Sequence, residues 1–145
     1  LAGNSFSDWQ NPQMHIVYEN ANSHQSFGYE TTKIIYQKMF SQVKEPLVIE
    51  GVAVMLDQTG RDYLALMKNN SFIPLANLVG VNWDLTNGDI KYYEAGLFSQ
   101  YLIDQYGIDL YSNLSNEKEF PLGYQNVYQK TLPELENEFR MAVGL

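Results

Sequence analysis

The sequence predicts a mainly α-helical domain with one short strand near its N-terminus. Apolar residues recur at intervals of three to five over most of the chain, which is the spacing of one face of a helix. Ser, Thr, Pro and Gly fall where such stretches begin and end. With 145 residues, 45% of them hydrophobic, the chain is long enough for a single packed core, so we predict one domain over residues 1–145.

The N-terminal third is predicted to contain an arm, a strand and two helices. Residues 1–13 are polar and rich in Gly, Asn and Pro, so we expect an irregular arm. The β-rich segment MHIVY (14–18) predicts a strand, followed by turn residues. One helix is expected over 26–42, with Ser26 as its N-cap. A second is expected over 46–57, with Pro46 in its first turn.

The rest of the chain is predicted to be helical with two polar interruptions. Helical periodicity is expected over four stretches before the last helix: 62–68, 73–79, 92–106 and 109–114. Polar composition predicts a loop over 82–90 and a long connection over 116–130. Thr131 and Glu134 have the spacing of a capping box and predict the start of the last helix.

Charge and composition exclude several classes of partner. The formal net charge is −8 with only nine Lys and Arg, so no phosphate-binding surface and no nucleic-acid partner are expected. No apolar run approaches 20 residues, which predicts no membrane span. The absence of Cys excludes disulfides and thiolate metal sites. Because the chain begins at Leu1, we expect it to be part of a longer precursor, and we favour a secreted or otherwise extracytoplasmic location.

Two carboxylates in apolar surroundings predict a site. Glu50 lies in PLVIEGVAVML, where each neighbour within three positions is apolar or Gly. A carboxylate in such a run needs a partner, a metal or water, or must be neutral. Glu30 opens the preceding helix between Tyr29 and Thr31, and Tyr29 and Lys33 are spaced i, i+4 and so share one face.

These motifs resemble those of the gluzincin zinc metallopeptidases, the thermolysin-like and M1-aminopeptidase-like group called peptidase MA. GYETTKIIYQ (28–37) followed by EPLVIEGVAVMLD (45–57) resembles the family's HExxH helix and the next helix, which carries a glutamate ligand. YYEAGLFSQYLIDQYG (92–107) and YQKTLPELENEFR (128–140) resemble two later family helices. The resemblance extends over about 14–143 and implies the helical C-terminal half of such a domain.

The resemblance also shows a departure from the family motif. It places Tyr29 and Lys33 at the two metal-binding histidines, and keeps Glu30 as a vestigial general base and Glu50 as the third ligand position. A protonated Lys cannot bind a metal ion and repels it, so no metal cofactor is expected. Its positive charge can instead offset the two carboxylates, and we predict an ion pair of Lys33 with Glu50, Glu30 or both.

The expected function is that of a non-catalytic, pseudoenzyme-type domain that binds a peptide or protein or serves as a scaffold. Tyr92 and Tyr93 are expected near the cleft, where the family places transition-state donors. An active zinc-dependent hydrolase remains the alternative, with a ligand set of Glu30, Glu50 and His15 or His24. A carbohydrate-binding or adhesion module is suggested by the aromatic content alone.

Overall fold

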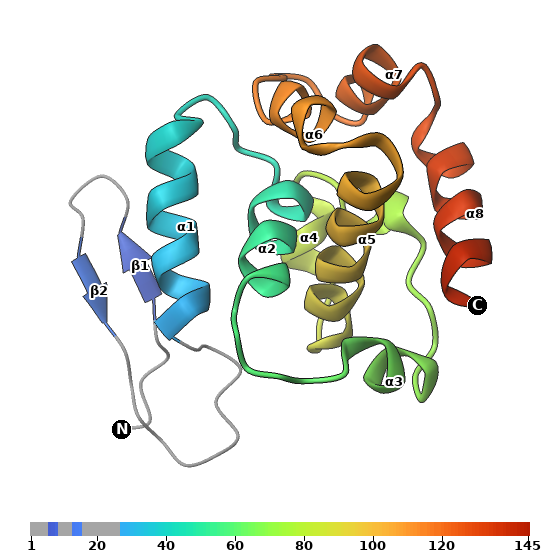
Figure 1. The fold of residues 1–145 in the computed structure, drawn as a ribbon, viewed down its shortest axis with the longest axis horizontal. Coiled ribbons are helices and arrows are strands. Elements are labelled where there is room, and N and C mark those ends of the chain that lie inside the picture. The colour runs from blue at the N-terminus through green and yellow to red at the C-terminus, as the bar shows by residue number, and fades with distance from the viewer. Residues whose placement is uncertain (1–5, 9–12, 16–26) are drawn as a thin grey trace.

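The computed structural model describes residues 6–8, 13–15 and 27–145. In this part the protein is mainly helical, as predicted (Figure 1). Strands β1 (Phe6–Asp8) and β2 (Gln13–His15) pair antiparallel, with Ser7 opposite Met14. β1 falls within the predicted arm, and β2 overlaps the strand predicted over 14–18, the rest of which lies outside the described residues. The predicted N-cap Ser26 also lies outside them.

The helices follow the predicted order, with two additions. The two that carry the predicted site are α1 (Phe27–Met39) and α2 (Pro46–Met55). The remaining elements are α3 (Tyr63–Lys68), the 3-10 helix η1 (Leu75–Leu78), α4 (Asn82–Leu85), α5 (Ile90–Tyr106), α6 (Ile108–Leu114), α7 (Leu122–Tyr128) and α8 (Leu132–Val143).

Helix α2 forms the centre of the fold. Apart from Glu50 its sequence is apolar, and its buried residues are Leu47, Val48, Ile49, Gly51, Val52, Ala53 and Val54. A helix that is apolar on all sides must be covered on all sides. α1 packs against one side of α2 and α5 against another (Figure 1). Glu45 fixes the start of α2, because its carboxylate accepts the backbone N–H groups of Leu47 and Gly80.

Helices α2 and α5 approach each other closely through glycines. A Cβ atom on Gly51 would lie 2.7 Å from the carbonyl oxygen of Ala95, and one on Gly96 would lie 2.5 Å from Cγ1 of Val54. Both distances are shorter than van der Waals contact, so larger residues would force the helices apart. The two glycines therefore set the position of Glu50 relative to α5.

Two predicted connections contain helices, and these predictions are wrong. α4 lies inside the predicted loop 82–90, where a single turn is held by the buried Trp83. α7 lies inside the predicted connection 116–130, where Tyr124 and Tyr128 are buried one turn apart. In both cases the buried face consists of aromatic residues in an otherwise polar stretch, and so the usual aliphatic periodicity is absent.

The helix predicted over 73–79 is the shorter η1, which follows Pro74. The last helix begins as predicted: the Glu134 side chain accepts the backbone N–H of Thr131 at 2.7 Å, and the reciprocal bond completes the capping box. This arrangement satisfies two of the donors that a helix N-terminus leaves free.

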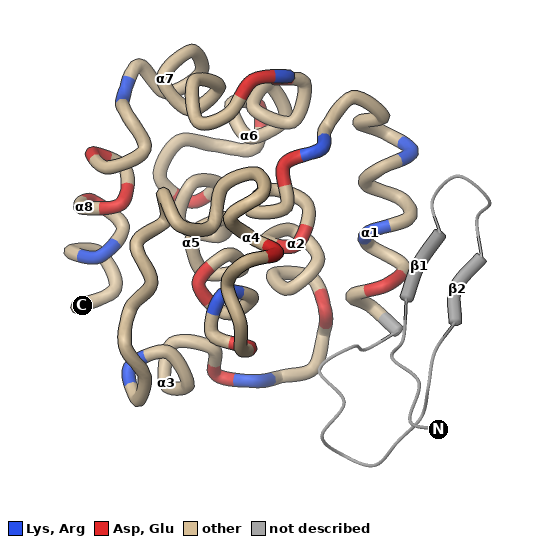
Figure 2. The backbone as a smooth tube through the Cα atoms, turned by 180° about the vertical axis from the view of Figure 1, so that it is seen from behind, with Lys and Arg blue, Asp and Glu red and all other residues tan. Residues whose placement is uncertain are grey.

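Basic residues are scattered along the described part of the chain rather than gathered on one face (Figure 2). In that same part, each helix is too short or too polar to cross a membrane, as the sequence predicts.

Candidate functional site

The predicted site lies where α1 meets α2. Tyr29 and Lys33 project from α1 one turn apart, and Glu50 projects from the middle of α2. The close packing of these helices brings together residues separated by 17 to 21 positions in the chain. The ring of Tyr92, near the start of α5, packs against the small apolar cluster around Tyr29.

Both oxygens of Glu50 are engaged by α1. The Lys33 ammonium lies 2.8 Å from Oε1, and the Tyr29 hydroxyl donates a hydrogen bond to Oε2. Lys33 also lies over the Tyr29 ring, 5.2 Å from its centroid, a distance suitable for a cation–π contact. The predicted ion pair between Lys33 and Glu50 is therefore present.

The ion pair is mostly shielded from water. The side chains of Lys33 and Glu50 are 20% and 15% exposed, which places the pair between a surface salt bridge and a fully buried one. An ion pair in this position is screened less by salt than one at the surface. The mutual attraction is correspondingly stronger, and loss of one partner leaves the other charge poorly solvated.

The tyrosines around the pair are neutral. Burial raises the pKa of Tyr29 well above its usual range, and the charge of Glu50 and the hydrogen bond to it raise it further. Burial likewise raises the pKa of Tyr92 to about 12, with the charge of Glu50 as the next cause. The Tyr29 hydroxyl is therefore a donor to the Glu50 carboxylate at physiological pH.

Glu30 lies on the buried side of α1 and is 1% exposed. Its charge contributes to the raised pKa values of both Tyr29 and Tyr92, and so it acts on the same site. It is also in the first turn of α1, where the helix dipole favours a negative charge. The structure thus brings together Tyr29, Glu30, Lys33 and Glu50, as the sequence predicts.

The two predicted cleft tyrosines diverge. Tyr92 turns toward the site and meets the Trp83 ring edge-on, with 5.2 Å between centroids. Tyr93 instead stacks on Tyr63 of α3, also with 5.2 Å between centroids. Tyr63 donates a hydrogen bond to Asp57, just after α2. The Tyr63–Tyr93 pair therefore joins α3 to α5.

Sequence reasoning missed Asp57 and Tyr63 as parts of this region. Asp57 accepts the backbone N–H of Thr59 at 2.9 Å, which is a local turn typical of Asp. That turn could be read from the sequence Asp-Gln-Thr-Gly. The contact of Tyr63 with Asp57 depends on how α3 folds back, and no local pattern encodes it.

The described residues do not fit a zinc ion. Tyr29 and Lys33 supply no imidazole, the Lys33 ammonium repels a cation, and the Glu50 oxygens are already bonded to Lys33 and Tyr29. Among the residues placed in the structure, no group of three or more His, Asp or Glu side chains is arranged to hold a metal ion. The histidines of the alternative ligand set lie outside the described part of the chain, which includes neither His24 nor the side chain of His15.

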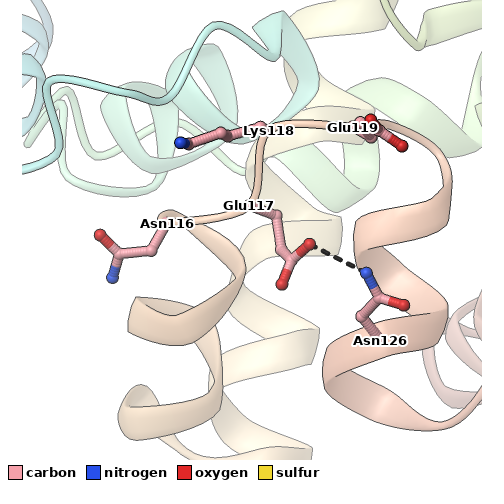
Figure 3. A pocket seen from close by; sticks show the side chains of 5 residues that line it. All are labelled: Asn116, Glu117, Lys118, Glu119 and Asn126. Atoms are coloured by element: carbon pink, nitrogen blue, oxygen red, sulfur yellow. Dashed lines mark hydrogen bonds between the residues drawn. The ribbon is translucent and has the colours of Figure 1, made fainter.

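A separate hollow of about 280 Å³ lies in the connection between α6 and α7 (Figure 3). Its lining is polar and of mixed charge: Asn116, Glu117, Lys118, Glu119 and Asn126. The Glu117 carboxylate accepts a hydrogen bond from the Asn126 amide at 3.0 Å. The hollow has no buried reactive group, so the α1–α2 site remains the candidate.

Comparison with known proteins does not identify a relative. No protein-family model, no curated protein and no solved structure matches the chain. The likeness to gluzincins therefore rests on the motifs of the chain itself.

Proposed function

We propose that the chain is a non-catalytic metallopeptidase-like domain in which an ion pair stands where family members hold zinc. Its role is that of a scaffold or a module for a peptide or protein partner. Tyr29 and Lys33 take the histidine positions, Glu50 the third-ligand position, and Glu30 that of the general base.

One observation carries the proposal: Glu50 is bonded at both oxygens by Lys33 and Tyr29. In a zinc site a divalent ion balances the carboxylates. Here the Lys33 ammonium lies 2.8 Å from Glu50 and supplies positive charge at the same place. A metal ion would have to displace this ammonium while meeting its repulsion.

The proposed partner surface adjoins the ion pair. Tyr92 and Tyr93 are partly exposed at the start of α5, and Tyr63 is partly exposed on α3. Half-exposed tyrosines offer a large contact area with few rotatable bonds and are enriched in binding surfaces. We therefore place the peptide or protein contact at this edge of the site.

The proposal is tested by metal analysis of the protein prepared without chelators, followed by a zinc titration in a calorimeter. Wild-type protein should contain no stoichiometric zinc and give no saturable binding heat. Incubation with a random-sequence peptide library should give no cleavage products by mass spectrometry, with or without zinc. Tyr92→Phe serves as the control for the titration, because it keeps the ring and the ion pair.

One equivalent of tightly bound zinc together with peptide cleavage would establish the alternative, an active metal-dependent hydrolase. In that case the Glu50→Gln variant should lose both properties. Zinc binding that survives Glu50→Gln would place the metal outside this site and leave the ion pair unexplained.

A further inference from the structure

Glu94 is a further buried carboxyl group of the helical core, apart from the site described above. Its side chain in α5 is 0% exposed. Oε1 accepts the backbone N–H of Ile73 at 2.7 Å. Oε2 receives no hydrogen bond from any residue that the structure describes. A carboxyl group in such a place is far more stable with a proton than with a charge.

The segment 69–74, between α3 and η1, is attached to the molecule through carboxyl groups. Ile73 is bonded to Glu94 of α5, and the Leu75 N–H, at the start of η1, donates to Oε2 of Glu136 in α8 at 2.7 Å. The segment has few other ways to pair its backbone, since it forms no helix or strand. The two carboxyl groups therefore supply the hydrogen bonds that keep this part of the backbone docked.

A ring contact adds to this attachment. The Phe72 ring lies 6.4 Å from the Phe139 ring of α8, measured between centroids. The Arg140 guanidinium of α8 lies over the Phe72 ring, 4.7 Å from its centroid. Phe72 is thus partly buried through contacts that exist only while the segment lies against α8.

The charges around Glu94 come mainly from α8. The charged residues on α5 and on the helices packed against it are Lys91 and Asp104 of α5, Glu50 of α2, Lys68 of α3, Asp109 of α6, and Glu134, Glu136, Glu138 and Arg140 of α8. The pKa of Glu94 is raised to about 8, with burial as the main cause. The hydrogen bond from Ile73 and the charge of Arg140 lower this pKa, and the charge of Glu136 raises it. Residues 69–74 contain no titratable group.

We propose that Glu94 is a proton-controlled latch: its neutral form holds residues 69–75 against α5 and α8, and its ionisation releases them. An ionised Glu94 has no access to water in the docked state, and the segment bonded to it through Ile73 belongs to no helix or strand and is the neighbour that can move away. Ionisation would also strengthen the bond from Ile73, which opposes release. Desolvation is the larger of the two effects, so release is favoured.

The test is amide hydrogen exchange measured by NMR between pH 6.5 and 9.5, with each rate divided by that of the unfolded chain. In the wild type, protection of the Ile73 amide should fall at least about tenfold between pH 6.5 and pH 8 and level off at higher pH, because ionisation is linked to opening only below the pKa of the docked carboxyl group. The Leu135 amide, bonded to Thr131 inside the α8 capping box, should stay constant. In Glu94→Gln, which keeps an oxygen acceptor and cannot ionise, Ile73 protection should be independent of pH.

Glu136→Gln provides an independent test on a partly exposed residue. Removal of this negative charge should lower the pH at which the fall in Ile73 protection levels off, whereas simple loosening of the segment would lower protection equally at each pH. The latch is refuted if wild-type Ile73 protection stays constant to pH 9.5, or if Glu94→Gln shows the same fall. A Glu94 carboxyl carbon that titrates near the ordinary value of 4.5 would refute it as well, even if Glu94→Gln does not fold.

Discussion

Glu50 in α2 and Glu94 in α5 are carboxyl groups on two helices that pack against each other, yet their surroundings differ. Glu50 is 15% exposed at its side chain and is bonded by an ammonium and a hydroxyl. Glu94 is fully buried and has a single backbone donor among the described residues. The core thus accepts a carboxylate charge at Glu50, where a lysine balances it, and favours a protonated carboxyl group at Glu94, where no lysine does.

The largest expected effect concerns Glu94 and pH. Its pKa in the folded protein is raised from 4.5 to about 8, so the folded state holds a proton that the unfolded state loses above pH 4.5. The stability contributed by this proton is complete below pH 4.5 and falls as pH rises to 8, by about 5 kcal/mol at most. Urea unfolding of wild type and Glu94→Gln at pH 5 and pH 8.5 measures it.

The difference in unfolding free energy between wild type and Glu94→Gln should change in favour of the variant at the higher pH. A difference that is the same at both pH values would mean that Glu94 titrates alike in both states. Burial would then not favour the protonated form of Glu94, and its contrast with Glu50 would disappear.

The next effect concerns the close contact between helices α2 and α5. Gly51→Ala should destabilise the protein by about 2–4 kcal/mol, because the new methyl group would meet Ser99 and the Ala95 carbonyl oxygen. Urea unfolding gives the value. Adding Ser99→Ala should recover only part of it, since the Ala95 carbonyl belongs to the backbone and remains 2.7 Å away. Full recovery would show that the helices are free to separate.

A smaller effect is expected for the ion pair. Lys33→Met should lower the unfolding free energy by about 1–3 kcal/mol, because Glu50 then keeps only the Tyr29 hydroxyl. Combining it with Glu50→Gln should recover part of the loss, since no unbalanced charge remains. Additive losses in a double-mutant cycle would show that the two residues do not interact.

The smallest effect is expected for a more exposed ion pair used as the reference. Lys130 and Glu138 lie 2.6 Å apart but are 36% and 33% exposed. Water and salt screen such a pair, so Lys130→Met should cost less than Lys33→Met and respond more strongly to added salt. Equal losses for the two variants would remove the argument that shielding strengthens the Lys33–Glu50 pair.

The sequence predicts the helices that have strong local signals. α2 is recognisable from its apolar run and Pro46, and α8 from Thr131 and Glu134, because caps and periodicity act within a few residues. The spacing of Tyr29 and Lys33 puts both on one face, and the gluzincin likeness pairs that face with α2. The contact between Lys33 and Glu50 could therefore be predicted.

Other features depend on contacts that no local pattern contains. The buried face of α7 is made by Tyr124 and Tyr128. Tyrosine is common on protein surfaces as well as in cores, so these residues alone do not predict a buried face. Glu94 is one turn from Phe98 on a buried stripe, but a Glu in an amphipathic helix is normally exposed. Its burial and its hydrogen bond from Ile73 depend on how separate parts of the chain pack around α5, which no local pattern contains.

The most direct test of the central claim, that the Lys33 charge takes the place of a metal ion, is a zinc titration of Tyr29→His/Lys33→His by calorimetry. Two imidazoles would join Glu50 and complete three protein ligands, so this variant should bind one zinc ion that the wild type does not, and adding Glu50→Gln should abolish binding. Circular dichroism must first show that the helices are intact. A folded double-His variant that takes up no zinc, or a wild type that takes up one equivalent, would contradict the claim.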